Sequence, residues 1–190
     1  MLDAGTMTLR ELINLHLEFR VALPADAPNI VALVESAYRG DASRVGWTTE
    51  ADILGGQRTD QDEVSSIIGD SSARILLAHS GLELLGCVML RDEPSSSYIG
   101  MLAIRPDCQA SGVGRKLLAE AERFATMEFC ATMARMTVII QREELIQWYE
   151  RRGYHRTDRR EAFPYGNPRF GLPKRPDLEF LVLEKSLVAP

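Results

Sequence analysis

The chain has 190 residues, a length that suits one domain or one domain with an extension. Hydrophobic residues make up 45% of it and charged residues 26%, which is a globular composition with enough apolar side chains for a sizeable core. The formal net charge of -5 argues against a nucleic-acid binder, and the lack of any run of about 18 apolar residues argues against a membrane span.

The apolar periodicity predicts one strand, two helices, three strands, and then helix, strand, helix and strand. Residues 1–17 have the character of an N-terminal extension, in which Leu9, Leu12 and Ile13 fit a short amphipathic helix. Residues 18–190 form a single domain in this interpretation. The predicted strands cover residues 18–23, 74–79, 84–91, 98–105, 135–140 and 178–183.

The helices are predicted from capping residues as well as from periodicity. Asp26 is a good N-cap for the first, and Thr49 has capping-box-like spacing to Asp52 for the second. The segment of residues 156–177, rich in Pro, Gly and Arg, is predicted to be mostly loop. The second helical region breaks at Gly55-Gly56 and resumes over residues 60–68. The predicted helices cover residues 26–40, 48–68 with that break, 112–127 and 143–152. This order gives a mixed α/β sheet with helices on both faces.

The charge is unevenly distributed along the chain. Residues 1–100 contain 7 Arg and no Lys against 15 acidic residues, whereas residues 151–190 contain 9 basic residues against 5 acidic ones. Such an asymmetry is either a solvated surface or an arrangement in which one end attracts cations and the other attracts phosphate.

The cysteines and histidines do not have the spacing of a metal site. The cysteine count is odd, and no Cys-x-x-Cys pair occurs. The histidines, His16, His79 and His155, lie far apart along the chain. We therefore expect no metal, reduced thiols and a cytoplasmic protein, since no signal-peptide pattern opens the sequence.

The most informative segment lies at the start of the helix predicted from residue 112. A buried strand ends at Ile104-Arg105-Pro106 and leads through Gln109-x-x-Gly112-x-Gly114 into that helix. Glycines at a helix start let backbone N–H groups approach an anion closely, and the helix dipole favours negative charge there. The pattern therefore predicts a pyrophosphate site, although two glycines alone also fit a plain turn.

Two other nucleotide-binding patterns do not fit this segment. A Rossmann fingerprint requires a third glycine three residues after Gly114, where Leu117 stands. A Walker A loop requires Gly-Lys-Ser/Thr, where the sequence has Gly114-Arg115-Lys116.

Two segments together resemble the GNAT superfamily of N-acetyltransferases. Gln109-x-x-Gly112-x-Gly114 resembles its motif A, and Tyr149-x-x-x-Gly153-Tyr154 resembles its helix-ending Tyr-x-x-x-Gly-Phe/Tyr motif. The order of strands matches over nearly the whole chain. The resemblance implies a GNAT-like α/β fold: a mixed, mostly antiparallel central sheet that is splayed in the middle and has helices on both faces.

The resemblance also implies an acetyl-CoA-dependent N-acetyltransferase that acts on a primary amine of a small molecule by direct attack in a ternary complex. Acetyl-CoA would bind along one strand and in the loop that follows it. The implied acetyl-CoA-binding residues are Leu102, Ala103, Ile104, Gln109, Ala110, Ser111, Gly112, Val113, Gly114 and Arg115. Tyr149 would point at the acetyl sulfur as the catalytic residue. No metal, nucleic acid or membrane is implied, and a homodimer stays open.

The acceptor side is less well defined. Arg142 stands where many members carry Asn. Tyr98 stands where histone acetyltransferases of the superfamily carry a Glu that acts as the general base. Because a Tyr is a poor base at neutral pH, no general base is identified. Candidates for lining the acceptor site are Trp47, Glu50, Tyr98 and Tyr165. Acidic residues from Glu50 onward either form a solvated face or attract a small cationic amine.

Other functions also remain open. A catalytically silent acyl-CoA sensor needs Gly112 and Gly114 but has no need of Tyr149. A transferase for a longer acyl chain or for a peptide amine differs only in pockets that the sequence does not define.

Overall fold

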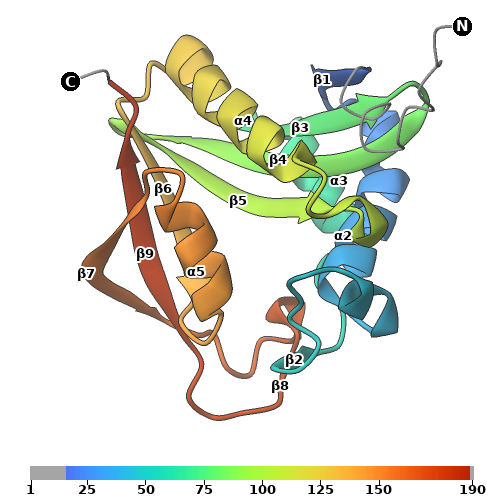
Figure 1. Cartoon of the computed structure of the whole chain (residues 1–190), viewed down its shortest axis with the longest axis vertical. Helices are drawn as coiled ribbons and strands as arrows, with labels where there is room; N and C mark the ends of the chain where they lie inside the picture. The colour runs from blue at the N-terminus through green and yellow to red at the C-terminus, as the bar shows by residue number, and fades with distance from the viewer. Residues whose placement is uncertain (1–15, 189–190) are drawn as a thin grey trace, which may run out of the picture.

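The computed structural model describes residues 16–188, in which seven strands form one sheet (Figure 1). Their order is β1-β3-β4-β5-β6-β9-β7, and all neighbours are antiparallel except β5 and β6. The strands are β1 (Leu17–Val21), β3 (Ala73–Ser80), β4 (Glu83–Glu93), β5 (Ser96–Ile104), β6 (Met133–Ile139), β7 (His155–Ala162) and β9 (Glu179–Ser186). The predicted mixed, mostly antiparallel sheet is confirmed. The helix suggested around Leu9 lies outside the described residues.

Helices cover both faces of the sheet, as predicted (Figure 1). The helices α2 (Ala27–Tyr38) and α3 (Gln61–Gly69) pack on one face, and α4 (Val113–Phe129) and α5 (Glu143–Glu150) pack on the other. Successive strand residues point to opposite faces, so Cys87 of β4 joins the core under α2 while Val88 joins the core under α4.

The sheet opens between β5 and β6. The two strands pair only where Ser96 to Tyr98 face Met133 to Arg135, and β5 then diverges from β6 (Figure 1). A bulge interrupts the pairing of β5 with β4, and Met101 within it has a φ of 49°. Near the point of divergence, the hydroxyl groups of Tyr98 and Thr137 share a hydrogen bond of 2.8 Å across the gap. The opening between β5 and β6 is therefore accompanied by a bulge and a specific hydrogen bond.

The prediction of a helix over residues 48–55 is wrong. A 3₁₀ turn (Asp41–Val45) comes first, and β2 (Leu54–Gly55) pairs with β8 (Leu172–Pro173). The Thr49 hydroxyl accepts a hydrogen bond from the backbone N–H of Ala51, a local bond that competes with helix formation. Glu50 turns inward to an ion-pair cluster that local propensity does not register.

The prediction that residues 156–177 are mostly loop is also wrong in part, because β7 occupies His155–Ala162. Its side chains are almost all exposed, so it lacks the apolar alternation by which strands are found. Among the described strands it pairs only with β9, at the edge of the sheet, and its arginines belong to a solvent-facing edge.

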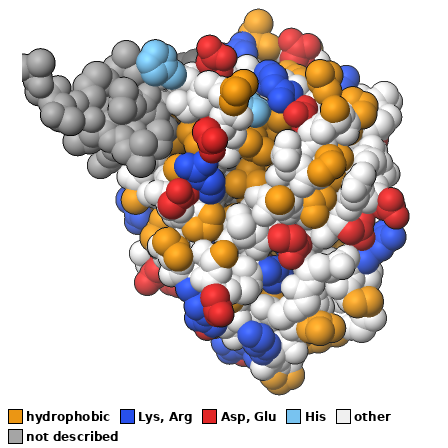
Figure 2. All heavy atoms as spheres, turned by 90° about the vertical axis from the view of Figure 1, so that its right-hand side faces the viewer, with side chains coloured by type: hydrophobic (Ala, Val, Ile, Leu, Met, Phe, Trp, Pro, Cys, Tyr) orange, Lys and Arg blue, Asp and Glu red, His pale blue; other side chains and the backbone are white. Residues whose placement is uncertain are grey.

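The surface shows no separation of charge on the face drawn in Figure 2, where acidic and basic side chains are interspersed. Within residues 16–188, no helix is both long enough and apolar enough to cross a membrane.

Gly86 allows β4 to lie close to the end of β5 and to α4, and this close approach can be tested. A Cβ atom at Gly86 would lie 2.6 Å from Ile104 Cδ1 and 3.0 Å from the Ala103 carbonyl oxygen. We expect Gly86→Ala to lower the free energy of unfolding by about 1–3 kcal/mol, measured by urea denaturation. Gly69→Ala is the control, because a Cβ there meets nothing within 4 Å; it should change stability by less than about 1 kcal/mol. Equal stability of the two variants would contradict this packing.

Candidate functional site

Two adjoining cavities lie where β5 leaves β6. We call the first, of about 530 Å³, the loop cavity, because it is lined by the Gln109–Gly112 segment, the start of α4 and one side of α5. We call the second, of about 350 Å³, the strand cavity, because it is lined by residues 98–102 of β5 and 136–139 of β6. Five residues line both cavities: Tyr38, Leu102, Arg142, Leu145 and Tyr149. The two spaces therefore meet around the side chain of Tyr149.

The backbone of the loop before α4 is shaped to hold an anion. Ala110 has a φ of 61° and Gly112, the N-cap of α4, a φ of 99°, so left-handed residues alternate with ordinary ones. Alternation of this kind turns successive N–H groups toward one concavity, and the α4 dipole adds positive potential there. A Cβ at Gly114 would lie 3.4 Å from Ile104, so the helix start packs closely against β5.

The structure brings together nearly all residues that the sequence assigned to acetyl-CoA. Those lining the loop cavity are Leu102, Ala103, Ile104, Gln109, Ala110, Ser111, Gly112, Gly114 and Arg115. Val113 is fully buried instead and belongs to the core beneath α4. Two carbonyls of this stretch of β5 already accept side-chain hydrogen bonds, at Leu102 from the Tyr38 hydroxyl and at Ile104 from Gln109. A carbonyl oxygen has two lone pairs, so each can accept a second bond.

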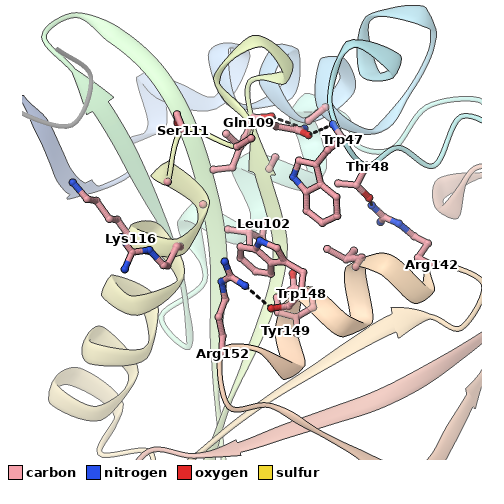
Figure 3. A pocket seen from close by; sticks show the side chains of 18 of the residues that line it. Trp47, Thr48, Leu102, Gln109, Ser111, Lys116, Arg142, Trp148, Tyr149 and Arg152 are labelled. Carbon is pink, nitrogen blue, oxygen red and sulfur yellow. Dashed lines mark hydrogen bonds between the residues drawn. The ribbon is translucent and has the colours of Figure 1, made fainter. Parts of the chain in front are cut away.

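Gln109 connects the loop to a second segment of the cavity wall (Figure 3). Its amide nitrogen donates to the Ile104 carbonyl at 3.3 Å, and its amide oxygen accepts from the Trp47 backbone N–H at 3.0 Å. The side chain passes where a Cβ of Gly46 would stand, only 2.3 Å from the amide oxygen. The Gly46-Trp47 segment is thereby fixed beside the loop before α4.

Aromatic rings also line the loop cavity. The rings of Trp47 and Trp148 lie 6.4 Å apart at 30°, and the guanidinium carbon of Arg152 lies 3.5 Å from the centre of the Trp148 ring. Figure 3 shows both indoles and Arg152 among the side chains that line the cavity. Trp47, a predicted acceptor-site residue, therefore lines the cavity that contains the loop before α4.

Tyr149 occupies the junction of the cavities. Its side chain is 7% exposed, and α5 places its ring against Trp148 and Tyr154. Burial raises the pKa of its hydroxyl well above the usual value. Within the described residues its hydroxyl has no hydrogen-bond partner. Tyr149 therefore stays protonated at physiological pH and can donate a hydrogen bond to a group that enters either cavity.

Glu50 lies at the centre of a buried ion-pair cluster. One oxygen accepts from Arg39 at 2.6 Å and the other from Arg142 at 2.7 Å, and Arg142 also donates to the Thr48 hydroxyl. Burial by itself would raise the pKa of Glu50, but the guanidinium groups of Arg142, Arg58 and Arg39 outweigh it and hold the pKa below its usual value. Glu50 is thus an internal carboxylate and does not contribute to an acidic surface.

The remaining acceptor candidates fall in different places. Tyr98 lines the strand cavity together with Glu50, and the guanidinium of Arg135 lies over its ring at 5.0 Å. Tyr165 lines neither cavity; its hydroxyl accepts from the Leu178 N–H and donates to the Arg175 carbonyl, which holds the 164–178 segment together. Among the described residues, no three His, Cys, Asp or Glu side chains are grouped as metal ligands.

Sequence reasoning missed several residues of the site. Arg58 and Tyr38 line the strand cavity, with the Arg58 guanidinium 5.4 Å from the centre of the Tyr38 ring. Arg152 could have been found, because it follows Trp148 by four residues and that spacing places both on one helix face. The others come from distant segments whose contact has no local signal.

The Glu50 cluster generates a pH-dependent prediction. We expect Glu50→Gln to lower the free energy of unfolding by about 3–5 kcal/mol at pH 7, because it leaves two buried guanidinium groups without their counter-charge. The lowered pKa of Glu50 stabilises the fold above the unfolded-state value of 4.5, and this contribution is lost as the pH falls through the folded-state pKa. The difference between wild type and variant should therefore shrink as the pH falls below about 4.5, measured by urea denaturation.

Asp52→Asn is the matched control for this measurement. Asp52 pairs with Arg44 on the surface, where both side chains are largely exposed. It should change stability by less than about 0.5 kcal/mol. A Glu50→Gln variant as stable as Asp52→Asn would show that the buried cluster contributes nothing to the fold.

Comparisons with known proteins agree with this architecture. A search of curated proteins found no match. Among solved structures, a spermidine N-acetyltransferase chimera of SpeG from Vibrio cholerae and hSSAT shares 16% identity with a TM-score of 0.65, covering 90% of this chain and 96% of that one. The yncA protein of Salmonella typhimurium, solved with acetyl-CoA, shares 17% identity with a TM-score of 0.66, covering 91% and 95%. An N-acetyltransferase of Staphylococcus aureus Mu50 shares 11% identity with a TM-score of 0.66, covering 91% and 99%.

At these identities the structural likeness establishes the fold and leaves the substrate open. The family is established separately. The model of the acetyltransferase (GNAT) domain family matches residues 49–164, which is more than half of the chain. This range includes the parts of β5, β6 and α5 that line the two cavities. The protein therefore belongs to the GNAT acetyltransferase family.

Proposed function

We propose that the protein transfers the acetyl group of acetyl-CoA to a primary amine of a small molecule, by direct attack in a ternary complex. The observation that carries the proposal is the meeting of two cavities at Tyr149 and Leu102. One cavity contains the loop before α4 and the other does not, so each can hold a different molecule and the two molecules can react at the junction. The acetyl-CoA held in the Salmonella typhimurium structure supports the identity of the first.

In this proposal the loop cavity holds acetyl-CoA. Its pyrophosphate lies on the N–H groups of residues 109–114 at the start of α4, with Arg115 beside it. The pantetheine arm runs along β5 from Leu102 to Ile104, taking the place that a neighbouring strand would fill beyond the divergence from β6. This route brings the thioester to Tyr149.

The amine enters from the strand cavity and attacks the thioester carbonyl. The new C–N bond forms as the C–S bond breaks, the sulfur leaves with negative charge, and the nitrogen loses a proton to solvent. Because the pKa of Tyr149 is raised above that of an ordinary phenol and a thiol titrates near 8.5, the hydroxyl stabilises the sulfur chiefly as a hydrogen-bond donor. A silent sensor has no need of a donor at the junction, so Tyr149 favours the enzyme.

The anion-binding loop can be tested by ligand-induced stabilisation. Acetyl-CoA should stabilise the protein by about 2.7 kcal/mol at a hundred times its Kd, seen as a rise in Tm. Gly112→Asp places a negative charge where the pyrophosphate binds and should remove most of that rise. Gly112→Asn is the isosteric control, since Asn and Asp share the same backbone strain at φ 99° but only Asp adds charge. If both variants kept the full rise, the pyrophosphate would have to bind elsewhere.

The role of Tyr149 can be tested by turnover. Tyr149→Phe keeps the ring and removes the donor, so it should lower kcat for CoA release by about ten- to a thousand-fold with little change in acetyl-CoA affinity. Tyr154→Phe is the control: Tyr154 is equally buried and contacts Tyr149, but it lines neither cavity, so kcat should stay near wild type. A folded Tyr149→Phe enzyme with unchanged kcat would reduce Tyr149 to a packing role.

A further inference from the structure

The strand cavity has a cationic side. Its charged lining residues are Arg39, Arg58, Arg142, Glu50 and Glu161. Glu50 binds both Arg39 and Arg142, so one carboxylate neutralises two guanidinium groups only in part. Glu161 is half exposed and pairs with Arg135, which lies outside the cavity lining. A surplus of positive charge therefore remains around Glu50.

Arg58 carries much of that surplus. Its guanidinium stacks over Tyr38 at 5.4 Å, and among the described residues no carboxylate forms an ion pair with it. In the part of the chain that the structure describes, Nε and one terminal nitrogen of Arg39, and Nε of Arg142, are buried without a hydrogen-bond partner. Arg39 as a whole is only 7% exposed. Buried donors without partners are costly, and an anionic group entering the cavity adds the missing negative charge.

The other side of the cavity is apolar. Phe163, Phe170 and Phe180 line it, with Met136 and Val138 from β6. Phe163 stacks on Phe180 at 5.6 Å and is almost fully buried. A molecule that fills the cavity thus meets guanidinium groups on one side and aromatic rings on the other.

We propose that the acceptor amine also carries a carboxylate and an apolar side chain, as an α-amino acid does, with Arg58 binding the carboxylate. This inference rests on the proposed acetyl transfer. It replaces the small cationic amine suggested by the sequence, because an amine without an anionic group would meet uncompensated positive charge. The positive charge of the guanidinium groups also lowers the pKa of the bound ammonium group. The neutral, nucleophilic form of the amine is therefore favoured even without a carboxylate that acts as a base beside it.

Matched acceptors test the proposal. With saturating acetyl-CoA, CoA release is measured with phenylalanine and with phenethylamine, which lacks only the carboxylate, and with methionine and 3-(methylthio)propylamine. We expect kcat/KM to be at least about ten-fold higher for each amino acid, the range of one charge-assisted hydrogen bond. Arg58→Gln should bring this ratio toward one, mainly by raising KM for the amino acid, and Arg58→Lys should restore part of it. Arg44→Gln removes the same charge from the outer surface and should leave the ratio unchanged.

A second readout does not require turnover. In the wild type, N-acetylphenylalanine should raise the Tm more than N-acetylphenethylamine. In Arg58→Gln, the two compounds should raise the Tm equally. Faster transfer to the simple amines, or a ratio unaffected by Arg58→Gln, would overturn the amino-acid proposal and leave acetyl transfer intact. If acetyl-CoA raised the Tm but no amine of either kind released CoA, the proposed function itself would fall.

Discussion

The divergence of β5 from β6 after Tyr98 is the constraint on which the rest of the site depends. A sheet that opens in its interior leaves backbone N–H and C=O groups without ladder partners, and such groups need others. The Tyr38 hydroxyl and the Gln109 amide supply two of them, at Leu102 and Ile104. The anion-binding loop, the aromatic wall and Tyr149 are arranged around the space that the divergence creates.

Charge is arranged around that space in two separate ways. On the loop side, positive potential comes from backbone N–H groups and the α4 dipole. On the strand side, it comes from the guanidinium groups held by Glu50. Arg142 connects the two, since it lines both cavities and binds Glu50 and Thr48. Arg142, which stands where the resemblance led us to expect Asn, thus lies at the junction of the two cavities.

The sequence was sufficient where the structure depends on residues that are close together in the chain. Periodic apolar residues predicted most strands and helices, and the glycines before α4 predicted the loop because a left-handed φ has a local signal at Gly112. The region around Glu50 could not be predicted, because its ion pairs join residues up to 92 positions apart. For the same reason the three phenylalanines and Arg58 had no recognisable pattern, and β7 was hidden by its exposure.

The edge strand β7 also bears on how the protein behaves at high concentration. Its arginines are each paired with a carboxylate, Arg156 with Glu143 and Glu150, Arg159 with Glu184, and Arg160 with Glu179. A foreign strand that added to this edge would have to displace or dehydrate these pairs. The edge is thus protected against sheet extension from one molecule to the next, and self-association through β7 into fibrous aggregates is disfavoured.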